Sequence, residues 1–204
     1  MLTRYKPLVT RSIEPLATWL ASIGVSPLAL TLTAPVLSSL ICFWFFRTRA
    51  VIPFCIAIVA AGCFDVLDGA VARASGRVTK FGAYLDAICD RYVEIIVTLT
   101  VAAVTGYWAL SFMVLSGALM VSYAKARAAM EVPISNQEWP DLMERTERSL
   151  LFVAGLAASR LMAWTPLGHD LFWWTLVCLA IAIHATVVQR ILRARRLITT
   201  RSNS

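Results

Sequence analysis

Four aspartates lie inside apolar stretches of this sequence, at spacings that would place them on helix faces. Asp65 and Asp68 are three residues apart in FDVLDGAVAR, and Asp86 and Asp90 are four apart in AYLDAICDRYVEIIV. Residues three or four apart share one face of a helix, so each pair would present its two carboxylates together. Carboxylates in apolar surroundings repel one another or take up protons unless a cation compensates them. A bound multivalent cation is therefore the simplest explanation of the four acids.

The ligand type narrows the choice of cation. Ligands that are all oxygen favour Mg²⁺, Mn²⁺ or Ca²⁺, and two ions a few ångströms apart would suit four acids. Mg²⁺ usually takes substrate phosphates as further ligands. Gly69 and Gly82 lie beside the acids, and helix surfaces without side chains would let a diphosphate approach the metal closely. Acids within the membrane also serve as ion-pair partners, such as Asp90 with Arg91, or as the cation or proton pathway of a transporter.

Long apolar segments must position these acids. Hydrophobic residues make up 59% of the 204 residues and charged residues 15%, and the mean hydropathy of +0.71 is not that of a soluble domain. Apolar runs of about 20 residues predict transmembrane helices. The six predicted spans are residues 27–46, 51–72, 83–105, 109–130, 148–167 and 171–192. We expect an all-α integral membrane protein that forms a single domain over residues 1–204.

The segment before the first span, residues 3–23, predicts an amphipathic helix at the membrane surface. Arg4, Lys6 and Arg11 would face the headgroups, and Trp19 and Leu20 would face the acyl chains. Because charged residues and proline interrupt this segment, it does not have the form of a cleaved signal peptide.

The basic residues predict the orientation. Most Lys and Arg residues fall at one end of the spans, and the other end keeps only Arg47, Arg49 and Arg160. Because Lys and Arg are enriched in cytoplasmic loops, we expect both termini and the acid pairs to face the cytoplasm, in the plasma membrane. This topology explains much of the net charge of +7, so we do not expect nucleic-acid binding. The link between the second and third spans is short, which predicts that these two helices are antiparallel neighbours.

The cysteines and histidines are interpreted as packing residues or as solvated residues, without a role in catalysis. The five cysteines lie singly in apolar segments and are read as small buried hydrophobic residues. His184 falls within the last span and is expected to pack with a hydrogen bond, whereas His169 falls in a loop and is expected to be solvated.

The spacing around the acids resembles the signature of the CDP-alcohol phosphotransferase family. The matching pattern is Asp-x2-Asp-Gly-x2-Ala-Arg-x8-Gly-x3-Asp-x3-Asp, formed by Asp65, Asp68, Gly69, Ala72, Arg73, Gly82, Asp86 and Asp90. The resemblance covers essentially the whole chain. It implies an enzyme of phospholipid biosynthesis that transfers a phosphatidyl-type group from CDP-diacylglycerol or CDP-archaeol to an alcohol and releases CMP. It also implies a homodimer that packs through membrane helices.

The resemblance implies roles for single residues. Asp65 and Asp86 resemble ligands shared by two Mg²⁺ or Mn²⁺ ions, and Asp68 completes the shell of one ion. Asp90 completes the other shell and acts as the general base. The residues implied to bind the CDP-lipid are Leu28, Ala29, Leu30, Thr31, Gly69, Arg73, Thr79 and Gly82. In the segment from Ser26 to Thr31, Ser26 stands where the family has Thr, and Leu28 stands where it has Asn or Asp. Thr31 alone therefore keeps the polar pattern.

Three basic segments remain for the acceptor alcohol, SYAKARA, ERTER and VVQR. Basic residues at helix ends often only mark the cytoplasmic side. These segments, however, resemble those of phosphatidylinositol phosphate synthases and their archaeal archaetidyl counterparts, in which such residues bind the phosphate of inositol phosphate. Thr146 stands where that pattern has Pro, and Arg148 could pair with Glu144 one turn back. The residues implied to bind the acceptor phosphate are Lys125, Arg127, Arg145 and Arg190.

The leading hypothesis is therefore transfer from a CDP-linked lipid to inositol phosphate. The nearest alternative is the same chemistry with glycerol 3-phosphate or another polar alcohol, because a phosphorylated acceptor also needs a phosphate pocket. A divalent-cation or proton transporter would use the same acids, but it leaves the spacing of the glycines and of Arg73 unexplained.

Overall fold

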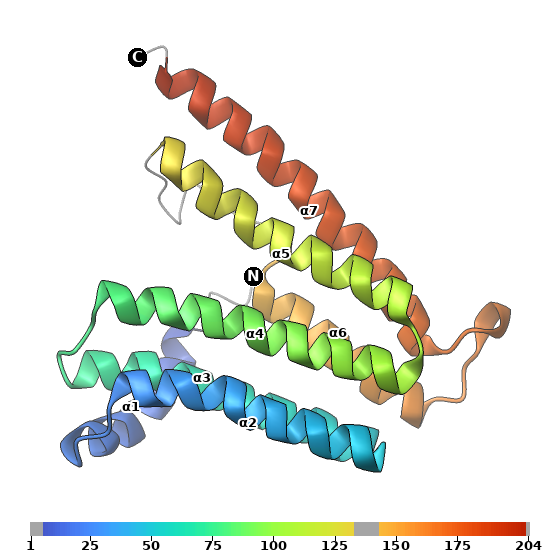
Figure 1. Cartoon of the computed structure of the whole chain (residues 1–204), viewed down its shortest axis with the longest axis horizontal. Helices are drawn as coiled ribbons and strands as arrows, with labels where there is room; N and C mark the ends of the chain where they lie inside the picture. The colour runs from blue at the N-terminus through green and yellow to red at the C-terminus, as the bar shows by residue number, and fades with distance from the viewer. Residues whose placement is uncertain (1–5, 133–142, 203–204) are drawn as a thin grey trace. The chain divides into compact units, whose positions relative to one another are not determined.

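The protein is helical throughout the residues that the structure describes. This computed structural model describes residues 6–132 and 143–202, without the side chains of residues 6–13, of Asp65 and of residues 201–202. The elements are α1 (Lys6–Ser22), α2 (Pro27–Thr48), α3 (Val51–Ala74), α4 (Lys80–Thr105), α5 (Trp108–Glu131), α6 (Arg145–Leu161), the 3₁₀ turn η2 (Pro166–Gly168) and α7 (Leu171–Ser202) (Figure 1). No strand occurs in the described ranges, so the all-α prediction is confirmed for them.

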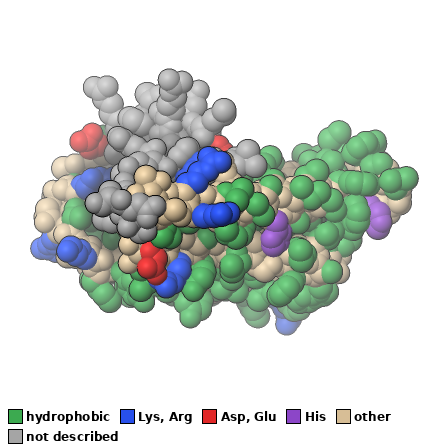
Figure 2. Space-filling model, turned by 90° about the horizontal axis from the view of Figure 1, so that it is seen from above, with side chains coloured by type: hydrophobic (Ala, Val, Ile, Leu, Met, Phe, Trp, Pro, Cys, Tyr) green, Lys and Arg blue, Asp and Glu red, His purple; other side chains and the backbone are tan. Residues whose placement is uncertain are grey.

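Four helices are long and apolar enough to cross a membrane by length and composition, namely α2, α3, α5 and α7. Hydrophobic side chains cover much of the face shown in Figure 2, as expected of a membrane protein whose surface meets lipid. The other two predicted spans differ from these four. The helix α6 has only 17 residues, and α4 has 26 residues but carries Asp86, Asp90 and Glu94.

The chain forms two compact units, Met1–Gly106 and Tyr107–Ser204. In the first unit, α2 packs against both α3 and α4. The prediction that the second and third spans are direct neighbours is wrong in this respect, because direct contact between α3 and α4 is slight at most. The helix α2 therefore makes the contacts that connect the two acid-bearing helices.

The helix α1 packs on α3 rather than standing apart from it. Ala17 is buried against Ala70 and Val71, and Leu20 packs around this cluster. The predicted outward direction of Leu20 is therefore wrong, whereas Trp19 is 58% exposed. Small side chains on both helices permit this close contact. The predicted headgroup contacts of Arg4, Lys6 and Arg11 fall outside the described side chains.

Aromatic and cationic contacts connect the helix ends away from the acids. Phe45 of α2 and Phe54 of α3 are fully buried and stack with 4.0 Å between their ring centroids. Arg49 ends α2 in a left-handed conformation. Its Nη1 donates to the carbonyl oxygen of Ala103 at 3.3 Å, in the last turn of α4. Since the last carbonyls of a helix have no partner within the helix, Arg49 stabilises the end of α4.

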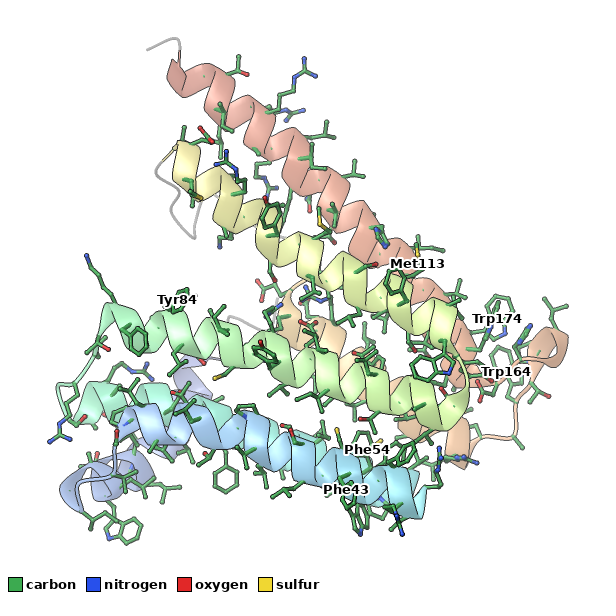
Figure 3. The ribbon with its side chains drawn as sticks, viewed as in Figure 1. Phe43, Phe54, Tyr84, Met113, Trp164 and Trp174 are labelled. Carbon is green, nitrogen blue, oxygen red and sulfur yellow. The ribbon has the colours of Figure 1, made fainter. Side chains whose placement is uncertain are left out.

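In the second unit, α7 packs against both α5 and α6. A Cβ on Gly117 of α5 would lie 2.7 Å from Cγ2 of Ile183, so α5 and α7 touch where Gly117 has no side chain. The Nε2 of His184 lies 3.1 Å from the carbonyl oxygen of Met113, a residue labelled in Figure 3. The prediction that His184 is a hydrogen-bonded packing residue is confirmed.

The loop between α6 and α7 is rich in aromatic contacts. His169 is exposed, as predicted, and stacks on Trp173 with 4.1 Å between ring centroids. The Oδ1 of Asp170 accepts a hydrogen bond from the backbone N–H of Trp173 at 2.8 Å. Burial and then the nearby Asp170 carboxylate raise the pKa of Tyr107 above its usual value. Trp174 donates from its indole nitrogen to the carbonyl oxygen of Pro166 at 3.2 Å.

The cysteine prediction is confirmed in part. Cys42, Cys55 and Cys89 are buried, whereas Cys63 and Cys178 are exposed on their helices.

Candidate active site

A cavity of about 620 Å³ lies in the first unit, where α2 begins, α3 ends and α4 begins. This size falls in the range of small-molecule sites, about 300–1,000 Å³. The residues that line it are Ser26, Pro27, Leu28, Thr31, Asp68, Gly69, Ala72, Arg73, Gly76, Arg77, Val78, Thr79, Gly82, Ala83 and Asp86. All of these residues belong either to residues 26–31, at the start of α2, or to residues 65–90, the segment that the signature spans.

The turn between α3 and α4 brings both acid-bearing helices to this cavity. Gly76 has a φ of +65°, a left-handed conformation that glycine adopts without strain. The N–H of Gly76 donates to the carbonyl oxygen of Arg73 at 3.2 Å, and the N–H of Arg77 donates to that of Ala72 at 2.9 Å. These two bonds form a Schellman motif, which ends a helix and reverses the chain within a few residues.

The helix α4 then begins at a hydroxyl cap. The Oγ1 of Thr79 accepts a hydrogen bond from the backbone N–H of Gly82 at 2.9 Å, the usual contact of an N-cap residue. A hydroxyl that accepts one bond keeps its own proton for donation. Thr79 therefore caps α4 and can still donate a hydrogen bond into the cavity that it lines.

Two of the predicted metal ligands meet at this cavity. Asp68 is only 7% exposed, and its Oδ2 accepts a hydrogen bond from Oγ1 of Thr31 at 2.5 Å. Its Oδ1 accepts from the backbone N–H of Gly69. Asp86 is half-buried and lines the cavity from α4. The structure thus brings one acid from each pair to the same cavity.

The other two predicted metal ligands are Asp90 and Asp65. Asp90 is half-buried one turn further along α4 and does not line the cavity. Asp65 belongs to α3, one turn before Asp68, and its side chain lies outside the described part of the chain. Among the described side chains, no group of three or more acids, histidines or cysteines is arranged to hold a metal ion, and Asp65 is not included in that statement.

The donor set nevertheless fits a hard divalent cation. Asp68 and Asp86 offer carboxylate oxygens, the ligands that Mg²⁺ and Mn²⁺ prefer. Mg²⁺ is usually held by one or two carboxylates, with water and substrate phosphates completing its coordination. The cavity beside the two acids has room for such a phosphate.

The predicted CDP-lipid residues divide into two groups. Those that line the cavity are Leu28, Thr31, Gly69, Arg73, Thr79 and Gly82. Ala29 is exposed outside the cavity, and Leu30 packs against the cluster of Ala17, Ala70 and Val71. Helical periodicity explains the division, because residues three apart share a face whereas the two residues between them point elsewhere.

The two signature glycines make room for neighbouring polar side chains. A Cβ on Gly69 would lie 3.3 Å from Nη1 of Arg73, so the guanidinium of Arg73 reaches back over Gly69. A Cβ on Gly82 would lie 3.0 Å from Oγ1 of Thr79. The open helix surfaces beside the acids are therefore occupied in part by the groups that are expected to bind the diphosphate.

Arg77 lines the same cavity, although sequence reasoning did not assign it to the site. It follows the left-handed Gly76 directly. A glycine just past the end of a predicted helix is the expected sign of a Schellman turn, and this sign could have placed Arg77 at the rim.

Glu94 has a partner on its own helix. The Nη1 of Arg91 lies 2.8 Å from Oε2 of Glu94, an ion pair between residues three apart. Such pairs stabilise helices by a few tenths of a kcal/mol, roughly 0.2–0.5. Glu94, an acid that the signature does not require, therefore contributes to α4 through Arg91.

In the second unit, Arg190 of α7 contacts α5 one turn before Lys125. Arg190 of α7 is 6% exposed, and its Nη1 donates to the carbonyl oxygen of Val121 in α5. Lys125 lies one turn after Val121 and is half-buried. A cation buried between two helices requires polar partners, so this part of the α5–α7 contact is polar.

Arg127 and Arg145 are placed differently. Arg127 forms an exposed ion pair with Glu131, with 2.6 Å between Nη1 and Oε1. Arg145 is the first residue of α6, which begins with a capping box in which Glu144 and Glu147 satisfy each other's backbone N–H groups. Thr146, which replaces the Pro of the related pattern, follows inside this first turn.

Arg148 is buried more deeply than the predicted Arg145. Arg148 is 5% exposed, and its Nη1 lies 3.4 Å from the carbonyl oxygen of Met143. Its backbone N–H donates to the carbonyl oxygen of Glu144 at 3.1 Å, as expected for the first turn of a helix.

The long apolar helices and the acid-lined cavity indicate a membrane protein with a site that suits a divalent cation and a phosphate group. Residues 25–181 match the CDP-alcohol phosphatidyltransferase family, and the chain belongs to that family. The match contains the whole signature and both helices that carry it.

Curated relatives and solved structures agree with this family. The chain is 35% identical over 160 residues to an archaetidylinositol phosphate synthase of Pyrococcus horikoshii, across 76% of this chain and 82% of the relative. It is 34% identical over 186 residues to a phosphatidylinositol phosphate synthase of Mycobacteroides abscessus, across 87% and 80% of the two chains.

Two crystal structures of the Mycobacterium tuberculosis phosphatidylinositol phosphate synthase are similar to this fold. The structure with CDP-DAG bound gives a TM-score of 0.77 at 27% identity, and the match covers 90% of this chain and 94% of that one. The complex with manganese and citrate gives a TM-score of 0.77 at 26% identity, with 88% and 87% covered.

Proposed function

We propose that this protein transfers a phosphatidyl-type group from a CDP-linked lipid to inositol phosphate and releases CMP. The observation that carries the proposal is that Asp68, Gly69, Arg73 and Asp86 line one common cavity. The named relatives are inositol phosphate lipid synthases, and the solved relative binds CDP-DAG. These similarities support both the donor and the acceptor.

The donor diphosphate would lie beside the acids. Asp65, Asp68, Asp86 and Asp90 would hold two Mg²⁺ or Mn²⁺ ions, which neutralise the diphosphate when bound, and the manganese complex of the solved relative supports the use of a divalent metal. Arg73 would bind the diphosphate through charge-assisted hydrogen bonds. The hydroxyl of Thr79 would donate a further hydrogen bond from the N-cap of α4.

The reaction is a displacement at the β-phosphorus of the donor. A bond forms between this phosphorus and the acceptor hydroxyl oxygen, and the bond from the phosphorus to the CMP oxygen breaks. Asp90 would take the proton of the attacking hydroxyl as general base. No covalent enzyme intermediate is needed, so no nucleophilic side chain is required.

The acceptor phosphate would be bound by Lys125, Arg127, Arg145 and Arg190. The buried Arg190 and the half-buried Lys125 form the stronger half of this set, because cations held in a partly desolvated position bind a dianion more strongly than exposed ones. Arg127 would have to leave its exposed ion pair with Glu131 in order to contribute.

The topology proposed for this function has six spans in one domain. The helices α4 and α6 would cross the plasma membrane with the four more apolar helices, and α1 would lie at the surface with Trp19 exposed. Both termini and the active site would face the cytoplasm, in accordance with the distribution of Lys and Arg. The protein would act as a homodimer, as the family resemblance implies.

The test is CMP release by the purified protein in detergent. The protein is incubated with CDP-diacylglycerol or CDP-archaeol, Mg²⁺ and one acceptor at a time, namely inositol phosphate, glycerol 3-phosphate or free inositol. We expect CMP release that depends on inositol phosphate and on Mg²⁺. Release that depends on glycerol 3-phosphate instead would refute the acceptor assignment. Metal flux into vesicles that contain the protein, without CMP release, would refute the assignment as a transferase.

A further inference from the structure

Thr31 makes a polar contact between α2 and the acid-bearing α3 at the cavity. Its Oγ1 donates to Oδ2 of Asp68 at 2.5 Å, across 37 residues of sequence. Both residues are buried, with Thr31 5% exposed and Asp68 7% exposed. The same hydroxyl lies 3.1 Å from the carbonyl oxygen of Pro27. A hydroxyl has one proton, and the shorter distance assigns that proton to Asp68.

The distance between Thr31 and Asp68 is short for a hydrogen bond from a hydroxyl group. Bonds from a hydroxyl to an ionised carboxylate are about 2.5–2.7 Å long and roughly twice as strong as bonds between neutral groups. The contact between Oγ1 of Thr31 and Oδ2 of Asp68 has a length within this range. Because the contact is buried, water competes little with it.

The two hydrogen bonds on Asp68 orient its carboxylate and leave room for a metal ion. Oδ2 accepts from Thr31 on α2, and Oδ1 accepts from the backbone N–H of Gly69 on α3. A carboxylate has about four lone-pair sites, so one site on each oxygen remains available. Hydrogen bonds from two different helices therefore restrain the orientation of the carboxylate.

We propose that Thr31 is a positioning residue that orients Asp68 for the divalent cation, rather than a residue that binds the nucleotide. The inference rests on the proposed function, in which Asp68 is a metal ligand. Partners of metal ligands typically change metal affinity by about 10–100-fold when they are removed. Thr31 occupies such a position, because its side-chain proton is engaged with the carboxylate and not with the cavity.

The alternative role for Thr31 makes a different prediction. A hydroxyl that binds the nucleotide would affect the affinity for the CDP-lipid at saturating metal, and it would leave the binding of the metal alone unchanged. A hydroxyl that only stabilises the α2–α3 contact would change the thermal stability without changing either affinity. The three roles therefore separate by direct measurement of metal binding.

The test measures Mn²⁺ binding to the full-length protein in detergent by electron paramagnetic resonance, without substrate. Thr31→Val removes the hydroxyl at nearly constant volume, and Thr31→Ser restores it. Thr33→Val is the matched control on the same helix, because the Thr33 hydroxyl is exposed and donates to the carbonyl oxygen of Leu30 at 2.6 Å. Thr31→Ala provides the same test if the valine variant does not fold.

We expect Thr31→Val to weaken Mn²⁺ binding about 10–100-fold, with Thr31→Ser and Thr33→Val close to wild type. The CDP-lipid KM at saturating Mn²⁺ should stay at the wild-type value. In an Asp68→Ala background the valine substitution should have no further effect on Mn²⁺ binding.

Three results would overturn the inference. These are unchanged Mn²⁺ affinity in Thr31→Val, a raised CDP-lipid KM as its sole effect, or a loss of metal affinity that persists in the Asp68→Ala background. The proposed function is tested apart from this, by CMP release from the wild-type protein. Wild-type activity together with normal Mn²⁺ binding by Thr31→Val would refute the positioning role alone.

Discussion

Gly69→Ala should separate the stability of α3 from substrate binding at the cavity. The new Cβ would have Nη1 of Arg73 as its described neighbour, at 3.3 Å, which the flexible end of the arginine relieves by moving a few tenths of an ångström. Alanine also favours a helix over glycine by up to about 1 kcal/mol. The free energy of unfolding should therefore stay the same or rise.

Binding should change in the opposite direction. The added methyl group occupies part of the cavity wall and shifts the guanidinium of Arg73 from the alignment that a hydrogen bond to the diphosphate would need. Loss of a charge-assisted hydrogen bond costs about 1.5–3 kcal/mol, which corresponds to about a 10- to 150-fold rise in Kd. The affinity for CDP at saturating Mn²⁺ is measured by calorimetry, and thermal unfolding is measured in the same detergent.

Gly62→Ala on the same helix is the matched control. Gly62 is exposed, and a Cβ there would meet no heavy atom within 4 Å. It should give the same gain in helix propensity with unchanged CDP affinity. The reasoning fails if Gly69→Ala binds CDP as tightly as the wild type, or if its loss of affinity accompanies a fall in thermal stability.

Three further predictions concern packing and the acceptor. Gly155→Ala should destabilise the protein by about 1–3 kcal/mol, because its Cβ would lie 2.4 Å from Cγ2 and Oγ1 of Thr175 and 2.7 Å from its Cβ; an unchanged melting temperature would contradict this close contact. Arg190→Lys should raise the KM for inositol phosphate more than Arg127→Gln does, because Arg190 is 6% exposed whereas the side chain of Arg127 is 51% exposed. Both KM values are measured from initial rates of CMP release, and a larger effect of Arg127→Gln would count against the proposed acceptor pocket. Asp90→Asn should keep CDP-lipid binding and lose turnover by about 10²–10⁴-fold, and undiminished single-turnover CMP release would exclude Asp90 as the base.

Hydrophobic runs located most of the helices within a few residues. The predicted span 51–72 corresponds to α3, Val51–Ala74, and 83–105 corresponds to α4, Lys80–Thr105. The starts of α4 and α6 differ because the caps at Thr79 and Glu144 are polar. A hydropathy run measures the apolar stretch, whereas the helix begins where a cap satisfies its first N–H groups.

Short-range features of the site could also be read from the chain. Asp68 and Asp86 reach one cavity because a turn of a few residues joins the helices that carry them. The ion pair between Arg91 and Glu94 follows from a spacing of three residues. These contacts depend on local helix geometry, which residue spacing describes directly.

The sequence by itself therefore determined the acids, their helices and the family whose chemistry they match. Only the tertiary structure placed α2 against both acid-bearing helices, turned Leu20 toward α3, and brought the hydroxyl of Thr31 to the carboxylate of Asp68. The physical reason is that helix periodicity tells which residues share a face, but not which other helix that face meets. That choice depends on how the side chains of several helices pack together, over distances in the sequence that no local pattern describes.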